Sequence, residues 1–152
     1  MNPVAVIALG NPLMGDEGVG QRVLDELRRE ADVRFPGVDF IDAGTGGLAA
    51  MHQMSGRAKV VFVDCAVMDV HPGEWRRFRP DDVVSRKVLP GDTLHEGDLL
   101  RTIDLARRLD AAPGEVVIIG IQPASIEPRL GLSDELRSRI GEYVAAVVAE
   151  LA

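Results

Sequence analysis

Three apolar runs, each long enough for one buried β-strand, constrain what this chain can fold into. They cover residues 4–9, 58–65 and 116–121 and are rich in Val and Ile. A run that is apolar on both of its faces is typical of a central strand in a parallel sheet, because helices cover both faces of such a sheet. The runs therefore predict an α/β fold in which helices connect the strands.

Amphipathic stretches separate the apolar runs, as such a fold requires. Apolar residues at helical spacing predict helices over residues 18–31, 47–54, 96–109 and 136–151. Ser133 is a favourable N-cap for the last of these helices. Further strands are predicted over residues 38–42 and 74–79, the second at an edge of the sheet. We expect three αβα layers and a single domain over residues 1–152.

Composition excludes several classes of protein. The chain has 152 residues with 17 Lys plus Arg against 24 Asp plus Glu, a net charge of −7. This acidity argues against a partner that is a nucleic acid or an anionic membrane surface. The single cysteine, Cys65, allows no internal disulfide and no Cys-based zinc site. No apolar run reaches the ~18–20 residues that span a bilayer, and residues 1–4 lack a basic leader, so we expect a cytoplasmic protein.

The loop after the first apolar run carries two acidic residues where a nucleotide-binding loop would carry a cation. Residues 10–20 read GNPLMGDEGVG. Gly10 and Gly15 have the spacing of a phosphate-binding loop, but Asp16 and Glu17 replace its Lys-Ser/Thr pair and would repel a phosphate. Carboxylates attract a cation instead. The alternative is that both acids only stabilise the beginning of a helix.

Two further residues follow strand ends or open helices, where an α/β sheet binds its ligands. Asp64 closes the apolar run 58–65, and a buried carboxylate is costly unless it is paired or binds a metal. The alternative for Asp64 is a cap on the next turn. His95 opens a predicted helix after a loop that contains proline and glycine. For His52 and His71 we expect surface or packing roles.

Glu17, Asp64 and His95 together form a set of two carboxylates and one imidazole. Such oxygen and nitrogen ligands suit a divalent ion such as Ni²⁺, Zn²⁺, Mn²⁺ or Fe²⁺, and the residue types do not select among these ions. Cys65 points to the face opposite Asp64 if both lie on a strand, so a packing role is expected for the thiol.

Five segments resemble the hydrogenase maturation endopeptidases, which trim the C-terminus of the large-subunit precursor of [NiFe]-hydrogenases. The segments, in chain order, are GNPLMGDEGVG at 10–20, DAGT at 42–45, VDCA at 63–66, TLH at 93–95, and GIQPASIEP at 120–128 with GLS at 131–133. The resemblance spans nearly the whole chain. It implies an αβα sandwich around a twisted, mostly parallel five-stranded sheet.

The resemblance also implies site residues and a substrate. Glu17, Asp64 and His95 would bind nickel that the precursor supplies, so that the protease cuts only a nickel-loaded precursor and the purified protein holds no metal of its own. A divalent ion can polarise the scissile carbonyl or activate a bound water. Asp16 or another nearby carboxylate is the candidate general base. The family is sometimes labelled aspartic-type, although no pepsin-like pair of carboxylates is evident here.

Substrate contacts are expected from two other loops. Asp42, Gly44 and Thr45 lie in a glycine-rich segment whose N–H groups could bind a peptide oxygen, or which is only a tight turn. Gln122 begins a loop that would line the substrate cleft, or whose prolines only stiffen a connection. A metal-binding chaperone that docks on the precursor without cutting it is the alternative function. A nucleotide-binding protein is a third, which Asp16 and Glu17 oppose.

Overall fold

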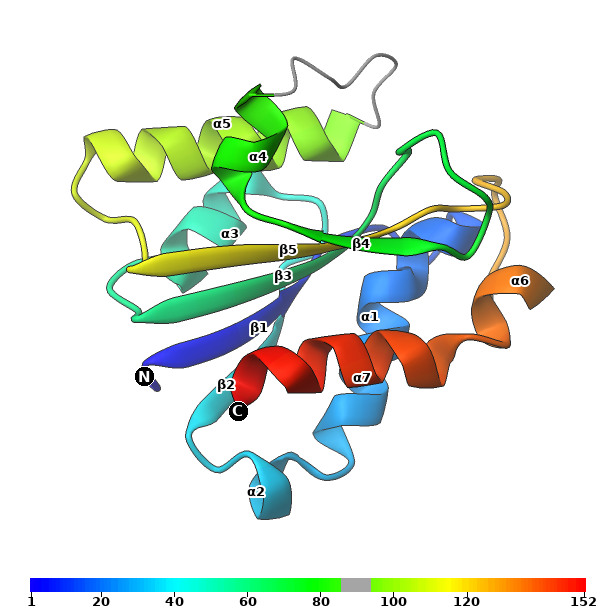
Figure 1. Ribbon diagram of the computed structural model, residues 1–152, viewed down its shortest axis with the longest axis horizontal. Helices are drawn as coiled ribbons and strands as arrows, with labels where there is room; N and C mark the ends of the chain where they lie inside the picture. Colours follow the sequence, from blue (N-terminus) through cyan, green and yellow to red (C-terminus); the bar gives the residue numbers. More distant parts are fainter. Residues whose placement is uncertain (86–93) are drawn as a thin grey trace.

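A five-stranded sheet lies at the centre of the structure (Figure 1). The structure is a computed structural model that describes residues 1–85 and 94–152, and the side chains of residues 83–98 lie outside that description. Its strands are β1 (Val4–Ala8), β2 (Val38–Asp42), β3 (Lys59–Cys65), β4 (Trp75–Phe78) and β5 (Glu115–Ile121). Their order across the sheet is β2-β1-β3-β5-β4. The first four strands in this order are parallel, and β4 pairs antiparallel with β5.

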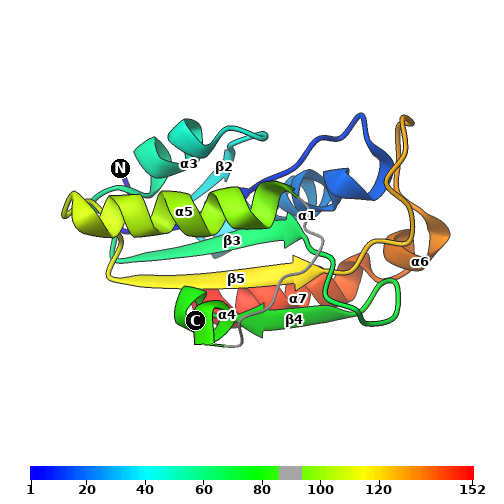
Figure 2. The ribbon, with the colours of Figure 1, turned by 90° about the horizontal axis from the view of Figure 1, so that it is seen from above.

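Helices cover both faces of the sheet, so the expected three αβα layers are confirmed (Figures 1 and 2). The helical segments in chain order are η1 (Gly15–Gly18), α1 (Val19–Arg28), α2 (Ala31–Arg34), α3 (Gly47–Met54), α4 (Pro80–Ser85), α5 (Leu94–Arg108), α6 (Asp134–Arg137) and α7 (Ile140–Leu151). Helices α1 and α7 pack on one face, and α3 and α5 pack on the other. Among the described helices, none is both long and apolar enough to cross a membrane.

The two faces of the strands form two separate hydrophobic cores. Val61 and Val63 of β3 pack with Cys65 against the α1 and α7 side. Val60 and Phe62 pack against the α3 and α5 side. The alternation follows from the two-residue period of a strand, and it explains why the apolar runs show no polar face. Cys65 therefore has the packing role that the sequence predicts.

Two of the expected helices are divided in the structure, and α4 (Pro80–Ser85) was not expected. The helix expected over 18–31 ends at Arg28, and a short α2 follows it. The helix expected to run on from Ser133 is divided into α6 and α7. Apolar spacing carries no sign of this division, because Leu136 and Ile140 are buried in the same core on either side of it. Ser133 does cap α6, since its side chain accepts a hydrogen bond from the N–H of Leu136.

Candidate active site

The four parallel strands end at one edge of the sheet, and the predicted site residues gather there. Figure 2 shows β3 and β5 ending at this edge, with the segments that follow β1 and β5 extending beyond it. Asp16 and Glu17 follow β1, Asp42 ends β2, Asp64 lies near the end of β3, and Gln122 follows β5. The carboxyl edge is the usual ligand-binding edge of an open α/β sheet.

Glu17 and Asp64 are both buried carboxylates. Their exposed fractions are 9% and 1%, respectively. Glu17 lies in η1, which packs against β3. Asp64 shares a strand face with Val60 and Phe62, so it lies on the α3 and α5 side of the sheet. Burial of two carboxylates at one edge favours a site for a cation, because solvent no longer compensates their charge.

His95 is the second residue of α5, and its side chain lies outside the described residues. The first turns of α5 nevertheless lie at the same edge of the sheet. Leu99 and Thr102 of this helix line a small cavity together with Leu9 and residues 44–47 of the loop after β2. Among the side chains that the structure describes, which do not include that of His95, no three His, Cys, Asp or Glu residues form a metal-binding group.

Asp16 is fully buried, and its carboxylate accepts four hydrogen bonds. Oδ2 accepts from the N–H groups of Ala124 (2.8 Å) and Ser125 (3.0 Å) and from the hydroxyl of Ser133 (2.8 Å). Oδ1 accepts from the N–H of Ser133 (2.7 Å). These donors come from the segment after β5. Asp16 therefore fastens that segment to the loop that carries Glu17, and this geometry favours a positioning role over proton transfer.

Close packing explains the glycines of the loop after β1. Gly10 has a φ of +134°, and a Cβ atom there would lie 2.0 Å from the carbonyl oxygen of Glu17. A Cβ atom on Gly20 would lie 2.6 Å from the carbonyl oxygen of Val63. Only glycine allows these approaches of one backbone to another. The glycines bring η1 and α1 against the strand ends, and this accounts for them without a phosphate ligand.

The loops after β1 and β2 are joined by Gln21, which the sequence analysis did not single out. Its side-chain amide donates to the carbonyl of Gly10 (2.9 Å) and to Oδ1 of Asp42 (3.1 Å). The same Asp42 oxygen accepts from the N–H of Gly44 (2.9 Å), and Gly10 donates its own N–H to the carbonyl of Gly44 (2.9 Å). The Asp42 side chain is exposed, so it is oriented by these contacts and still accessible.

The segment from Gly44 to Gly47 forms a tight turn that leads into α3. Gly44 has a φ of +58°, and Thr45 is exposed at the surface. The cavity between this turn and α5 has a volume of about 10 Å³. That volume is about the size needed for one water molecule, so the cavity does not hold a small organic ligand. The turn therefore forms part of the open protein surface and does not line a ligand-binding cavity.

Gln122 is buried and ties the end of β5 to the segment before β4. Its side-chain Oε1 accepts from the N–H of Met68 at 2.6 Å. Its backbone N–H donates to the carbonyl of Glu74, and its carbonyl accepts from Gly73, both at 2.9 Å. These contacts occupy the side-chain oxygen and both backbone groups of Gln122, and so they favour a positioning role for this residue.

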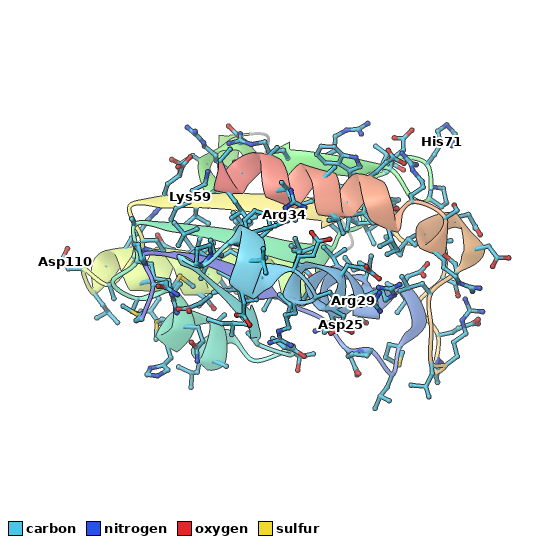
Figure 3. The ribbon with its side chains drawn as sticks, turned by 90° about the horizontal axis from the view of Figure 1, so that it is seen from below. Asp25, Arg29, Arg34, Lys59, His71 and Asp110 are labelled. Carbon is cyan, nitrogen blue, oxygen red and sulfur yellow. The ribbon has the colours of Figure 1, made fainter. Side chains whose placement is uncertain are left out.

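His52 and a cavity of about 600 Å³ lie away from this edge. His52 is exposed on α3, whereas His71 is exposed in the segment between β3 and β4, which Figure 3 shows at the end of the molecule opposite Asp110. This cavity is lined by residues that include His52, Asp39 and Arg57, beside β2. There the Arg57 guanidinium contacts the Asp39 carboxylate at 2.6 Å and lowers the pKa of that carboxyl group. This pairing neutralises the charge of Arg57.

Comparisons with known proteins agree with the fold. The family model described as "Hydrogenase maturation protease" matches residues 22–150. The "Hydrogenase 2 maturation protease" of Escherichia coli K12 is 26% identical, over 97% of this chain and 90% of that protein. The "Hydrogenase expression/formation protein HupM" of Azotobacter chroococcum is 28% identical, over 98% of this chain and 71% of that protein.

Solved structures extend this similarity to three dimensions. The hydrogenase maturating endopeptidase HybD from E. coli superposes with a TM-score of 0.85 at 25% identity, over 99% of this chain and 92% of that chain. A hydrogenase 2 maturation peptidase from a Thaumarchaeota archaeon superposes with a TM-score of 0.72 at 32% identity, over 99% and 98% of the two chains. The αβα fold is shared with proteins that are named as proteases and endopeptidases, a class of hydrolase. The chain belongs to the hydrogenase maturation protease family.

Proposed function

We propose that this protein is the endopeptidase that removes the C-terminal peptide from a nickel-loaded precursor of a [NiFe]-hydrogenase large subunit. Membership of the hydrogenase maturation protease family gives the reaction class. The observation that carries the proposal is the burial of Glu17 and Asp64 at one edge of the sheet, next to the loops that would receive a polypeptide. The cytoplasmic location expected from the sequence belongs to the same proposal.

Glu17, Asp64 and His95 are the residues that would hold the nickel, which arrives as part of the substrate. Two carboxylates and one imidazole are a donor set that suits nickel. Burial of the carboxylates supports this role, because a cation compensates the cost of removing their charge from water. The ion would also polarise the bond to be cut or activate a water molecule.

The chain's own loops would orient the peptide around this point. Asp42 and Thr45 are exposed beside the candidate site, and Gln21 and Gly44 fix the orientation of the Asp42 carboxylate. These two residues are therefore our candidates for contact with the substrate. Asp16 and Gln122 would act through the loops that they hold in place, since their oxygens already accept hydrogen bonds within the protein.

The intact mass of a precursor tests this function directly. Precursors of the hydrogenase large subunits from the source organism would be incubated with the protein, in nickel-loaded and nickel-free form. We expect loss of a C-terminal peptide from the loaded form alone. Loss of the peptide from both forms would support the protease activity and show that cleavage does not require nickel. If the protein bound precursors but none of them lost mass, the proposed protease activity would be contradicted and the non-cleaving chaperone would be favoured.

A further inference from the structure

Three exposed apolar side chains lie on two hydrogen-bonded loops beside the candidate active site. Leu13 precedes η1, and Ile126 and Leu130 lie in the segment that follows β5. Their exposed fractions are 64%, 37% and 78%, respectively. We refer to residues 11–14 and 124–132 as the paired loops. Large apolar side chains that are exposed together mark an interaction site more often than singly scattered ones do.

Backbone hydrogen bonds join the paired loops to each other. The N–H of Arg129 donates to the carbonyl of Leu13 (3.1 Å), and the N–H of Gly15 donates to the carbonyl of Arg129 (3.0 Å). Asp16 holds the beginning of the second loop through Ala124 and Ser125. Figure 2 shows the two loops side by side beyond the strand ends. The apolar surface is therefore formed before a partner binds, which reduces the ordering cost of binding.

The paired loops are continuous with the candidate active site. Leu13 and Glu17 lie in the same loop after β1, one on either side of Gly15. A polypeptide bound at Glu17 extends over the adjoining surface, and the paired loops form part of that surface. The cavity of about 10 Å³ beside the turn after β2 is too small to hold an apolar side chain. Recognition of a polypeptide here therefore depends on exposed surface.

The chemistry of the paired loops selects an apolar partner surface. Leu13, Ile126 and Leu130 carry no charge, and the charges between them compensate each other, since Arg129 contacts Glu127 at 3.5 Å. We propose that the paired loops are the docking surface for the hydrogenase precursor, with Leu13 and Leu130 binding an apolar segment of that protein next to the bond that is cut. This proposal rests on the proposed function.

The test is a double substitution, Leu13→Ser with Leu130→Ser, in the full-length protein. Cleavage kinetics on the nickel-loaded precursor should show KM raised about tenfold or more, because burial of two leucines on docking is lost. The kcat value should stay unchanged, because no reacting group is altered. The double variant Leu13→Met with Leu130→Met should keep the KM of the unsubstituted protein, since methionine provides an apolar side chain of similar volume.

Leu109→Ser is the matched control for exposure. Leu109 is 61% exposed, close to Leu13, and it precedes Asp110, which Figure 3 shows at the opposite end of the molecule. The KM of the Leu109→Ser variant should equal that of the unsubstituted protein. If the unsubstituted protein cleaves the precursor normally and the double serine variant has the same KM, the proposed docking surface would be refuted and the proposed function would stand. Failure of the unsubstituted protein to bind or cleave any precursor would overturn the proposed function, and the docking surface with it.

Discussion

The side-chain amide of Gln21 donates a hydrogen bond to Asp42 across the ends of two neighbouring strands, at 3.1 Å. Its second contact, to the carbonyl of Gly10, makes it a link between the loops after β1 and β2. Gln21 is buried on the first turn of α1, so its contact with Gly10 is shielded from water and its contact with Asp42 is partly shielded. The orientation of Asp42 therefore depends on a helix residue that belongs to no motif of the sequence.

Replacing Gln21 with methionine should lower the free energy of unfolding by about 1–3 kcal/mol, because two hydrogen bonds are lost at similar side-chain volume. Urea unfolding would measure the change. Asp25→Asn is the control on the same helix, since Asp25 is exposed and labelled at the surface in Figure 3. Equal unfolding midpoints for Gln21→Met and Asp25→Asn would show that the link contributes nothing.

Asp16→Asn should destabilise the protein by about 2 kcal/mol or more, because an amide nitrogen would face N–H donors that now contact a buried carboxylate. Thermal unfolding and cleavage should then fall together, and Ser133→Ala should weaken both to a smaller extent. If Asp16→Asn instead kept the unfolding temperature of the unsubstituted protein and lost only cleavage, Asp16 would be assigned the role of general base.

The three candidate nickel-binding residues should be separable from the residues that maintain the fold. Glu17→Gln, Asp64→Asn and His95→Ala should each abolish processing of the precursor while circular dichroism stays unchanged, because each removes one donor to the ion. His52→Ala and His71→Ala are the controls, and both should process normally because these side chains lie at the surface. Retained processing in all three test variants would refute the assignment.

Tyr143 should titrate far above the usual range. Its hydroxyl is buried and donates to the carbonyl of Gly73 at 2.6 Å, and burial raises the pKa to about 12. The unfolded tyrosine ionises near pH 10. Between these values the folded state binds more protons than the unfolded state, so stability should fall as pH rises from about 10 to about 12.

The chain contains one tyrosine, so the absorbance of tyrosinate reports this group alone. An ionisation midpoint near 10 in the folded protein would contradict the buried geometry. Tyr143→Phe should remove the fall in stability over this range. It should also lower stability at neutral pH by about 1 kcal/mol, because the carbonyl of Gly73 loses its buried donor.

The sequence predicts some parts of the fold and of the candidate site, and particular residues show why it does not predict the others. The strands were predictable because Val and Ile runs at strand length leave few alternatives, and the strand ends then placed Glu17 and Asp64 at one edge. The division between α6 and α7 was not predictable, because Leu136 and Ile140 keep helical spacing across it.

Polar contacts over long sequence separations were also beyond prediction. Gln21 lies in a helix between apolar residues, and nothing in its neighbours indicates a partner in β2. The donors to Asp16 lie more than a hundred residues away, where Ser133 was predicted only as a helix cap. Hydrogen-bond partners of this kind are set by the packed fold, so periodicity does not report them.

The contact between Asp16 and Ser133 spans 117 residues of sequence. Contacts of such separation form only after the intervening chain has been ordered, because the entropy of closing the loop must be overcome first. During synthesis, a chain that has emerged only as far as β3 already contains Glu17 and Asp64, but it lacks every donor that fixes Asp16. The protein therefore acquires a formed site only after its last third has emerged and docked, and a partly synthesised copy cannot act prematurely on its target.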